Sequence, residues 1–102
     1  MKEFSIQIIK VIQSIPKSKV LTYKAVAEMA GNPYGSRQVS RILHSCSEKY
    51  QLPWHRIVNS KGSISLSYGA GYELQEALLK AEGVKVDSEG KIDLETYLWK
   101  AE

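Results

Sequence analysis

Two short helical segments joined by a tight turn constrain the fold of this chain more than any other feature. Thr22 can cap a helix that ends at Ala30, because its hydroxyl can accept a hydrogen bond from the first helical turn. Gly31 and the dipeptide Asn32-Pro33 predict a stop and a turn, and Gly35-Ser36 opens the next helix. This order of helix, tight turn and helix is typical of a helix-turn-helix unit.

The second of these helices is predicted to have one apolar face and one basic face. Its apolar stripe comprises Val39, Ile42 and Leu43. Arg37, Arg41 and His44 are spaced i, i+4 and i+7 and therefore fall on the opposite face. No acidic residue occurs between Glu28 and Glu48. A helix with this pattern is suited to lie against a polyanion.

The flanking segments predict two further helices and a short extended piece. Apolar residues at helical spacing predict a helix over 4–15, which Pro16 ends because the residue before a proline disfavours helix. Val20 and Leu21 are expected to be extended. A later helix is predicted over 72–82, with Gly83 as its C-cap. Its expected inner face comprises Leu74, Leu78 and Ala81.

The segment after Pro53 predicts a small β-hairpin. The runs HRIV and SISL are rich in β-branched residues and are separated by the turn sequence NSKG. A further turn is expected about Glu89-Gly90. Together these elements predict a mainly α fold with a small β-hairpin, a winged-helix-type helix-turn-helix domain that spans residues 1–102.

Composition narrows the class of protein. A chain of 102 residues with 43% hydrophobic side chains can form one compact core, and no apolar run approaches the roughly 20 residues that span a bilayer. The single cysteine, Cys46, forbids an internal disulfide and makes a zinc site improbable. We expect a cytoplasmic monomer, associated with the nucleoid if the source is prokaryotic, with no membrane partner, cofactor or metal.

Charge is distributed unevenly along the chain. Residues 4–72 carry nine Lys and Arg against two acids, whereas residues 73–102 carry four against eight. The net charges are therefore +7 and −4. The first two thirds would attract a nucleic acid, although small domains often have uneven charge by chance.

Four motifs, in this order, carry a resemblance to a known family. They are VLTYKAVAEMAGNP, GSRQVSRIL, PWHRIV and LLKAEGV, within residues 4–99. This pattern resembles the DNA-binding, active-site domain of the O6-alkylguanine-DNA alkyltransferases, and most closely the alkyltransferase-like proteins. The resemblance implies binding to double-stranded DNA that contains O6-alkylguanine.

The resemblance also implies loss of catalysis, because the family motif is PCHRV and its cysteine accepts the alkyl group. Trp54 occupies that place here, and an indole supplies no nucleophile. His55 and Glu82 align with the residues that activate the cysteine, but without the cysteine they would have nothing to deprotonate. The alternative is that they only hold the pocket together. Trp54 is interpreted as a pocket wall, with a simple core aromatic as the alternative.

Other residues are given roles by the resemblance. Tyr23 aligns with the tyrosine that rotates the target nucleotide, and Arg37 with the arginine that fills the vacated stack. Their spacing of 14 residues, followed by 17 to Trp54, matches the family pattern; a core tyrosine and a phosphate contact are the alternatives. Backbone or minor-groove contacts are expected from Ser36, Gln38, Ser40 and Arg41. The predicted lesion pocket comprises Pro53, Trp54, His55, Ser67, Tyr68 and Glu82.

By resemblance, nucleotide excision repair proteins are the expected downstream partners, and the acidic C-terminal third is a candidate docking face for them. Two other classes of function remain open. One is an enzyme, either an alkyltransferase that uses Cys46 or a hydrolase that uses His55 and Glu82. The other is a transcriptional helix-turn-helix regulator, which would require a dimer and a fixed operator.

Overall fold

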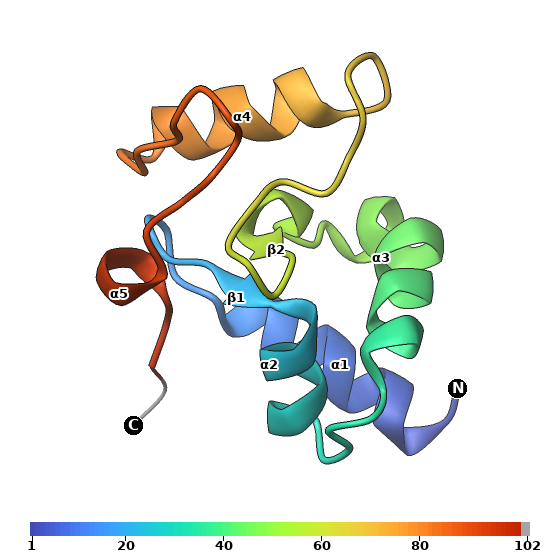
Figure 1. Cartoon of the computed structure of the whole chain (residues 1–102). Coiled ribbons are helices and arrows are strands. Elements are labelled where there is room, and N and C mark those ends of the chain that lie inside the picture. The colour runs from blue at the N-terminus through green and yellow to red at the C-terminus, as the bar shows by residue number, and fades with distance from the viewer. Residues whose placement is uncertain (101–102) are drawn as a thin grey trace.

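The computed structural model describes residues 1–100 and places helices at both ends of a very small sheet (Figure 1). Helices α1 (Glu3–Ser14), α2 (Tyr23–Met29) and α3 (Ser36–Tyr50) pack on one another at one end. Helix α4 (Tyr72–Ala81) covers the other end. Strands β1 (Leu21–Thr22) and β2 (Ile57–Val58) lie between them, next to the 3-10 turn η1 (Trp54–Arg56).

The predicted helix-turn-helix is present. The Thr22 hydroxyl accepts a hydrogen bond of 3.0 Å from the Ala25 N–H, which caps α2. In the turn, the Asn32 carbonyl accepts from the Gly35 N–H at 3.0 Å, and Gly35 packs so closely on Phe4 of α1 that a larger residue would clash. Helix α3 therefore starts at a position fixed by both neighbouring helices.

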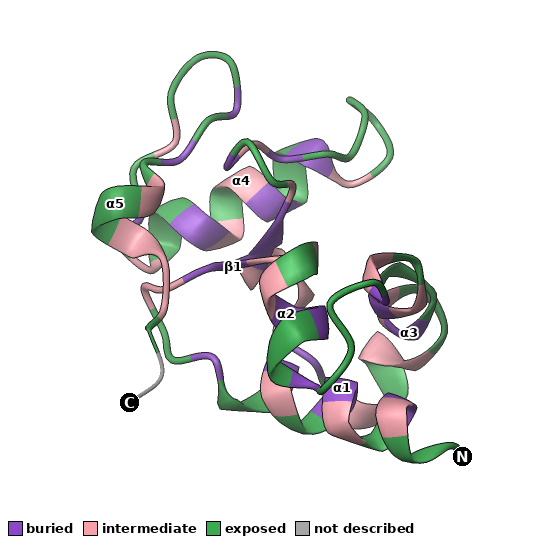
Figure 2. Cartoon of the chain, turned by 60° about the horizontal axis from the view of Figure 1, so that its bottom comes forward, coloured by how far each residue is buried: buried purple, intermediate pink, exposed green. Residues whose placement is uncertain are grey.

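Two clusters of buried residues hold the fold together (Figure 2). The first lies among α1, α2 and α3 and includes Ile8, Ile12, Val26 and Val39, each fully buried. The second joins α4 to the loops near the C-terminus and includes Val58, Leu79 and Ile92. The two clusters meet at the sheet, where Leu21 and Ile57 belong to the first cluster and Val20 and Val58 to the second.

The predicted β-hairpin is wrong in its pairing. Strand β2 pairs in parallel with β1, with Leu21 opposite Ile57 and Thr22 opposite Val58. The NSKG turn does form, because the Asn59 Oδ1 accepts from the N–H groups of Lys61 and Ser63. Beyond the turn, the chain pairs with the C-terminal segment at Lys91, because Ile64 is buried in the second cluster.

The inner face predicted for α4 is also wrong. Tyr72, Gln75 and Leu79 are its buried residues, whereas Leu74 is 56% exposed and Ala81 is exposed. Leu78 is half-buried. The sequence holds two overlapping stripes at helical spacing, and the loop that packs on Tyr72 determines which of them is buried.

The C-terminal segment closes the structure. The expected turn forms over Asp87–Gly90, and helix α5 (Leu94–Tyr97) follows it. Leu98 then forms a bridge to Val20 at the edge of β1. Over residues 1–100, no helix combines the length and hydropathy needed to cross a bilayer.

Candidate nucleic-acid interface

A cavity of about 400 Å³ opens between α3 and α4, and we call it the α3–α4 cavity. Its volume falls within the range of about 300–1,000 Å³ that is usual for small-molecule sites. The first wall comprises Tyr23 of α2 and Ser40, Leu43, His44 and Ser47 of α3. Trp54 of η1 and Ile57 of β2 also line it, and the remaining lining residues, from α4 and the loop before it, are Leu66, Ala70, Gly71, Leu74 and Gln75. The cavity thus lies between the helix-turn-helix and α4.

Trp54 is the first residue of η1 and brings its half-buried indole to the cavity. Its ring meets the His55 ring edge-on, with centroids 6.2 Å apart and planes at 87°. Pro53 is the N-cap of η1 and does not line the cavity. Leu43, Leu66 and Leu74 line the same cavity, so it presents a flat aromatic surface together with apolar side chains.

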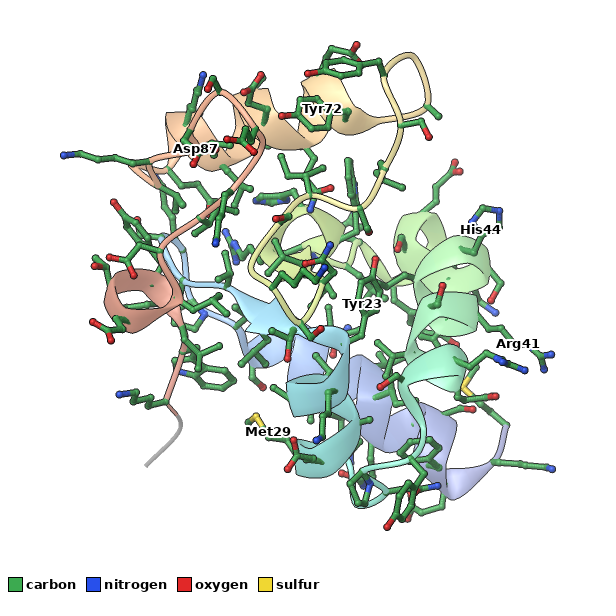
Figure 3. The ribbon with its side chains drawn as sticks, in the orientation of Figure 1. Tyr23, Met29, Arg41, His44, Tyr72 and Asp87 are labelled. Carbon is green, nitrogen blue, oxygen red and sulfur yellow. The ribbon has the colours of Figure 1, made fainter. Side chains whose placement is uncertain are left out.

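Tyr23 lies at the start of α2 and reaches the space between α2, α3 and the loop after β2 (Figure 3). Its hydroxyl is 3.2 Å from the Ser65 Oγ. Tyr23 and Ser40 also line a second groove of about 480 Å³, together with Ser36 and Arg37. The two residues expected to handle the nucleotide, Tyr23 and Arg37, therefore share one continuous surface next to Trp54.

The outward face of α3 is cationic, as its spacing predicts. Arg37, Arg41 and His44 are all exposed, and Figure 3 shows Arg41 and His44 pointing away from the rest of the molecule. In the described part of the chain, neither arginine lies within ion-pair distance of a carboxylate. Gln38 turns instead toward α1, where its amide is 3.5 Å from the Ser5 Oγ.

His55 and Glu82 meet outside the cavity. The Nε2 of His55 lies 2.8 Å from the Oε2 of Glu82, and Nη2 of Arg56 lies 2.6 Å from the same oxygen. The Ser18 N–H donates to Oε1 at 3.1 Å, and the Ser18 hydroxyl binds the Glu82 carbonyl. Burial alone would raise the pKa of Glu82, but the hydrogen bonds from Arg56, His55 and Ser18 outweigh it and lower the pKa to about 2.

Ser67 and Tyr68 are exposed and do not line the cavity in this structure. The Tyr68 ring lies against Tyr72, with centroids 4.5 Å apart. The Gly69 N–H donates to the Glu73 carboxylate at 2.9 Å, a hydrogen bond that holds the pKa of Glu73 below its ordinary value. This hydrogen bond holds the loop that carries Ser67 and Tyr68 against the first turn of α4. Leu66 and Ala70, which belong to the same loop, line the cavity.

The sulfur of Cys46 is not at the cavity. Cys46 is half-buried and packs against the first cluster, and its Sγ lies 3.5 Å from the Ser45 Oγ. Over residues 1–100, no three His, Cys, Asp or Glu side chains come together as a metal site would require.

Sequence reasoning missed several residues at this site. Gln75 is 2% exposed and binds the backbone on both sides of Arg56, and its only signal in the sequence is its spacing from Tyr72 and Leu79. Arg56 belongs to the PWHR motif but was given no role. Leu74 was predicted to be in the core and is instead a wall of the cavity.

Comparison with known proteins agrees with this geometry. Residues 3–84 match the family model described as "6-O-methylguanine DNA methyltransferase, DNA binding domain". A protein of Vibrio parahaemolyticus named "DNA base-flipping protein" is 46% identical over 97% of this chain and 98% of its own. Alkyltransferase-like protein 1 of Schizosaccharomyces pombe is 35% identical over 98% of this chain and 97% of its own.

Solved structures agree in fold. S. pombe Atl1 in complex with damaged DNA containing O6-carboxymethylguanine superimposes with a TM-score of 0.86 at 35% identity, over 99% of this chain and 98% of that chain. The Mycobacterium tuberculosis OGT in complex with DNA, at 22% identity over 81% of this chain and 50% of that chain, has a TM-score of 0.67 and shares the fold. The chain therefore belongs to the family of the 6-O-methylguanine DNA methyltransferase DNA-binding domain, and within it to the alkyltransferase-like proteins.

Proposed function

We propose that this chain binds double-stranded DNA that carries O6-alkylguanine, rotates the damaged nucleotide out of the helix and houses it in the α3–α4 cavity. The observation that carries the proposal is that Tyr23 and Trp54 line this one cavity while Arg37 lies exposed beside it. A base can enter a protein cavity only after it is extruded from the stack, and the gap that it leaves must be filled. Relatives named for base flipping, and one solved with damaged DNA, support the same function.

The positions of these residues support the following roles. Tyr23, at the cavity edge, presses on the backbone of the target nucleotide, and Arg37 enters the vacated stack. Trp54 packs against the base or its alkyl group. Ser36, Ser40 and Arg41 hold the DNA backbone along α3, where cationic contacts give affinity without sequence preference.

The protein leaves the alkyl group on the DNA. Alkyl transfer requires a thiolate or comparable nucleophile near the alkyl carbon, and among the described residues that line the cavity none carries a thiol. Trp54 stands where the family motif has its cysteine. Binding is therefore the function, and the bound complex would serve as the signal for nucleotide excision repair.

The first experiment is a binding titration at fixed salt with two duplexes that differ only in O6-methylguanine or guanine, followed by recovery of the lesion. We expect at least tenfold tighter binding to the lesion, about 1.4 kcal/mol, with the methyl group still on the DNA. Equal affinities would reduce the chain to a non-specific DNA-binding protein, and a vanished methyl group would refute the assignment of Trp54. Tyr23→Ala should weaken binding to the lesion duplex, because it removes the ring proposed to press on the DNA backbone and rotate the nucleotide.

Recruitment of nucleotide excision repair proteins requires a separate experiment. Reversing the exposed charges of Asp87, Glu89 and Asp93 should reduce capture of nucleotide excision proteins by the lesion complex. The same variant should bind the damaged duplex as the parent does, because these residues lie outside the α3–α4 cavity and the grooves beside it. Unchanged capture would remove the acidic third of the chain as the docking face.

A further inference from the structure

Tyr34 projects from the turn between α2 and α3 and is almost fully exposed. Its exposed fraction of 94% is the largest among the exposed large hydrophobic residues of the described chain. The backbone beneath the ring is nevertheless held in place. The Tyr34 N–H donates to Asn32 Oδ1 at 3.0 Å, and the neighbouring Gly35 is buried against Phe4. The fold thus presents a tyrosine ring on a fixed turn without burying it, an arrangement that suits an interface.

Tyr34 lines a groove of about 360 Å³ between the start of α1 and this turn, which we call the α1–turn groove. Arg37 and Lys2 give the groove its positive charge, and none of the described residues that line it is acidic. In residues 1–100, Lys2 lies within ion-pair distance of no carboxylate. The groove therefore combines free cations with hydroxyl and amide donors, which are the groups that bind phosphate oxygens. Its polar lining residues are Lys2, Ser5, Asn32, Tyr34, Arg37 and Gln38.

Arg37 separates the α1–turn groove from the groove that holds Tyr23. The two grooves share Arg37 and no other described residue. Each groove of duplex DNA is bounded by two backbones, so a side chain that enters the stack through a groove has one strand on either side. In the function proposed above, Arg37 enters the stack and Tyr23 presses on the strand that carries the lesion. The α1–turn groove, beyond Arg37, then faces the opposite strand.

We propose, on the basis of the function proposed above, that the α1–turn groove binds a phosphate of the strand opposite the lesion. Lys2 supplies the charge, and the Tyr34 hydroxyl donates a hydrogen bond to a phosphate oxygen. The opposite strand is thereby held on one side of Arg37 while Tyr23 moves the damaged nucleotide on the other. The contact also makes a duplex a better ligand than a single strand that carries the same lesion.

The test replaces the phosphates of the opposite strand, one position at a time, with uncharged methylphosphonates in an O6-methylguanine duplex. For the wild-type protein, one position should lower the affinity about fivefold or more, the scale of a lost hydrogen bond to a charged group. The double variant Lys2→Ala, Tyr34→Phe should bind the unmodified duplex more weakly, and its response at that position should fall below about twofold. Both side chains are exposed, so we expect this variant to fold.

Lys10→Ala is the control for the loss of charge, because Lys10 is an exposed lysine of α1 that does not line the groove. It should keep the full response at the sensitive position. An equal response in the wild-type protein and the double variant would overturn this role of the groove. The absence of a sensitive phosphate on the opposite strand would overturn it as well.

A single-stranded oligonucleotide with O6-methylguanine tests the choice of strand independently. Tyr34→Phe, which leaves the charge intact, should bind this oligonucleotide as tightly as the wild-type protein does. Weaker binding by the variant would contradict the assignment of the groove to the opposite strand. Failure of the lesion-binding function would appear in a different measurement, as equal affinity for duplexes with O6-methylguanine and with guanine.

Discussion

Nη2 of Arg56 lies 2.6 Å from Oε2 of Glu82, and this ion pair ties the turn that carries Trp54 to the C-terminal end of α4. Arg56 also donates to the Ile15 carbonyl at 2.8 Å, so the tie extends to the end of α1. A carboxylate held by a permanent cation and by His55 is suited to fix the geometry of the cavity rather than to move protons.

Glu82→Gln should therefore lower stability in a pH-dependent way. At pH 7 we expect a loss of about 2 kcal/mol in the free energy of unfolding, somewhat below the cost for a fully buried pair. The folded-state pKa of about 2 lies below the ordinary value of 4.5, so the carboxylate stabilises the fold above about pH 4.5. That stabilisation is lost as the pH falls from about 4.5 to about 2. Urea unfolding across this range measures the difference, which should disappear at the acid end.

Glu76→Gln is the control for this prediction. Glu76 pairs with Lys80 at 3.5 Å on the same helix, but the lysine is 55% exposed. An exposed pair of this kind contributes about 0.5 kcal/mol or less. Equal losses of unfolding free energy in Glu82→Gln and Glu76→Gln would contradict the proposed structural role of the Arg56–Glu82 ion pair.

Arg37→Ala and Arg41→Ala should separate lesion recognition from general DNA binding. Because we propose that Arg37 fills the vacated stack, we expect its loss to lower the preference for O6-methylguanine over guanine about tenfold, or 1.4 kcal/mol. Loss of Arg41 should weaken both complexes alike and reduce the slope of the logarithm of affinity against the logarithm of salt by about one. Titrations at several salt concentrations measure both quantities. An unchanged preference in Arg37→Ala would count against its role in the stack.

The helix-turn-helix could be predicted because its signals are local. The Thr22 cap, the Asn32-Pro33 turn and the periodicity of α3 act within a few residues of one another. The pairing of β2 depends on β1, which is distant in the sequence, and no local pattern distinguishes that partner from a hairpin neighbour. The inner face of α4 was missed for a similar reason, since packing chooses between two stripes.

Part of the candidate site could be predicted through the family motifs. They led to Tyr23, Arg37 and Trp54, which the fold brings to one surface. They did not lead to Gln75, because a polar residue on a buried helix face gives no local sign of what it binds. The roles of all these residues remain predictions, and those of Ser67 and Tyr68 depend also on how the loop lies when DNA is bound.

The two tryptophans allow the role of Trp54 to be measured directly. Trp99 packs against the first cluster, away from the cavity, so Trp99→Phe leaves Trp54 as the reporter. Its fluorescence should be quenched when the O6-methylguanine duplex is added, because the base stacks on or near the indole. The converse variant, Trp54→Phe, should show little change. Trp54→Ala should weaken lesion binding by about 1–3 kcal/mol, the usual range for a base against an aromatic ring.

Gly90 and Gly83 provide a test of how the C-terminal loop supports α4. Both have positive φ, at +77° and +87°. A Cβ at Gly90 would lie 2.5 Å from the Tyr72 Oη and 2.8 Å from its ring, whereas a Cβ at Gly83 would meet nothing within 4 Å. Gly83→Ala should therefore cost only the backbone strain, about 1–2 kcal/mol. Gly90→Ala should cost at least about 1 kcal/mol more, because Tyr72 must shift and the buried face of α4 shifts with it. Urea unfolding of both variants measures the difference, and equal losses would mean that Tyr72 moves aside freely.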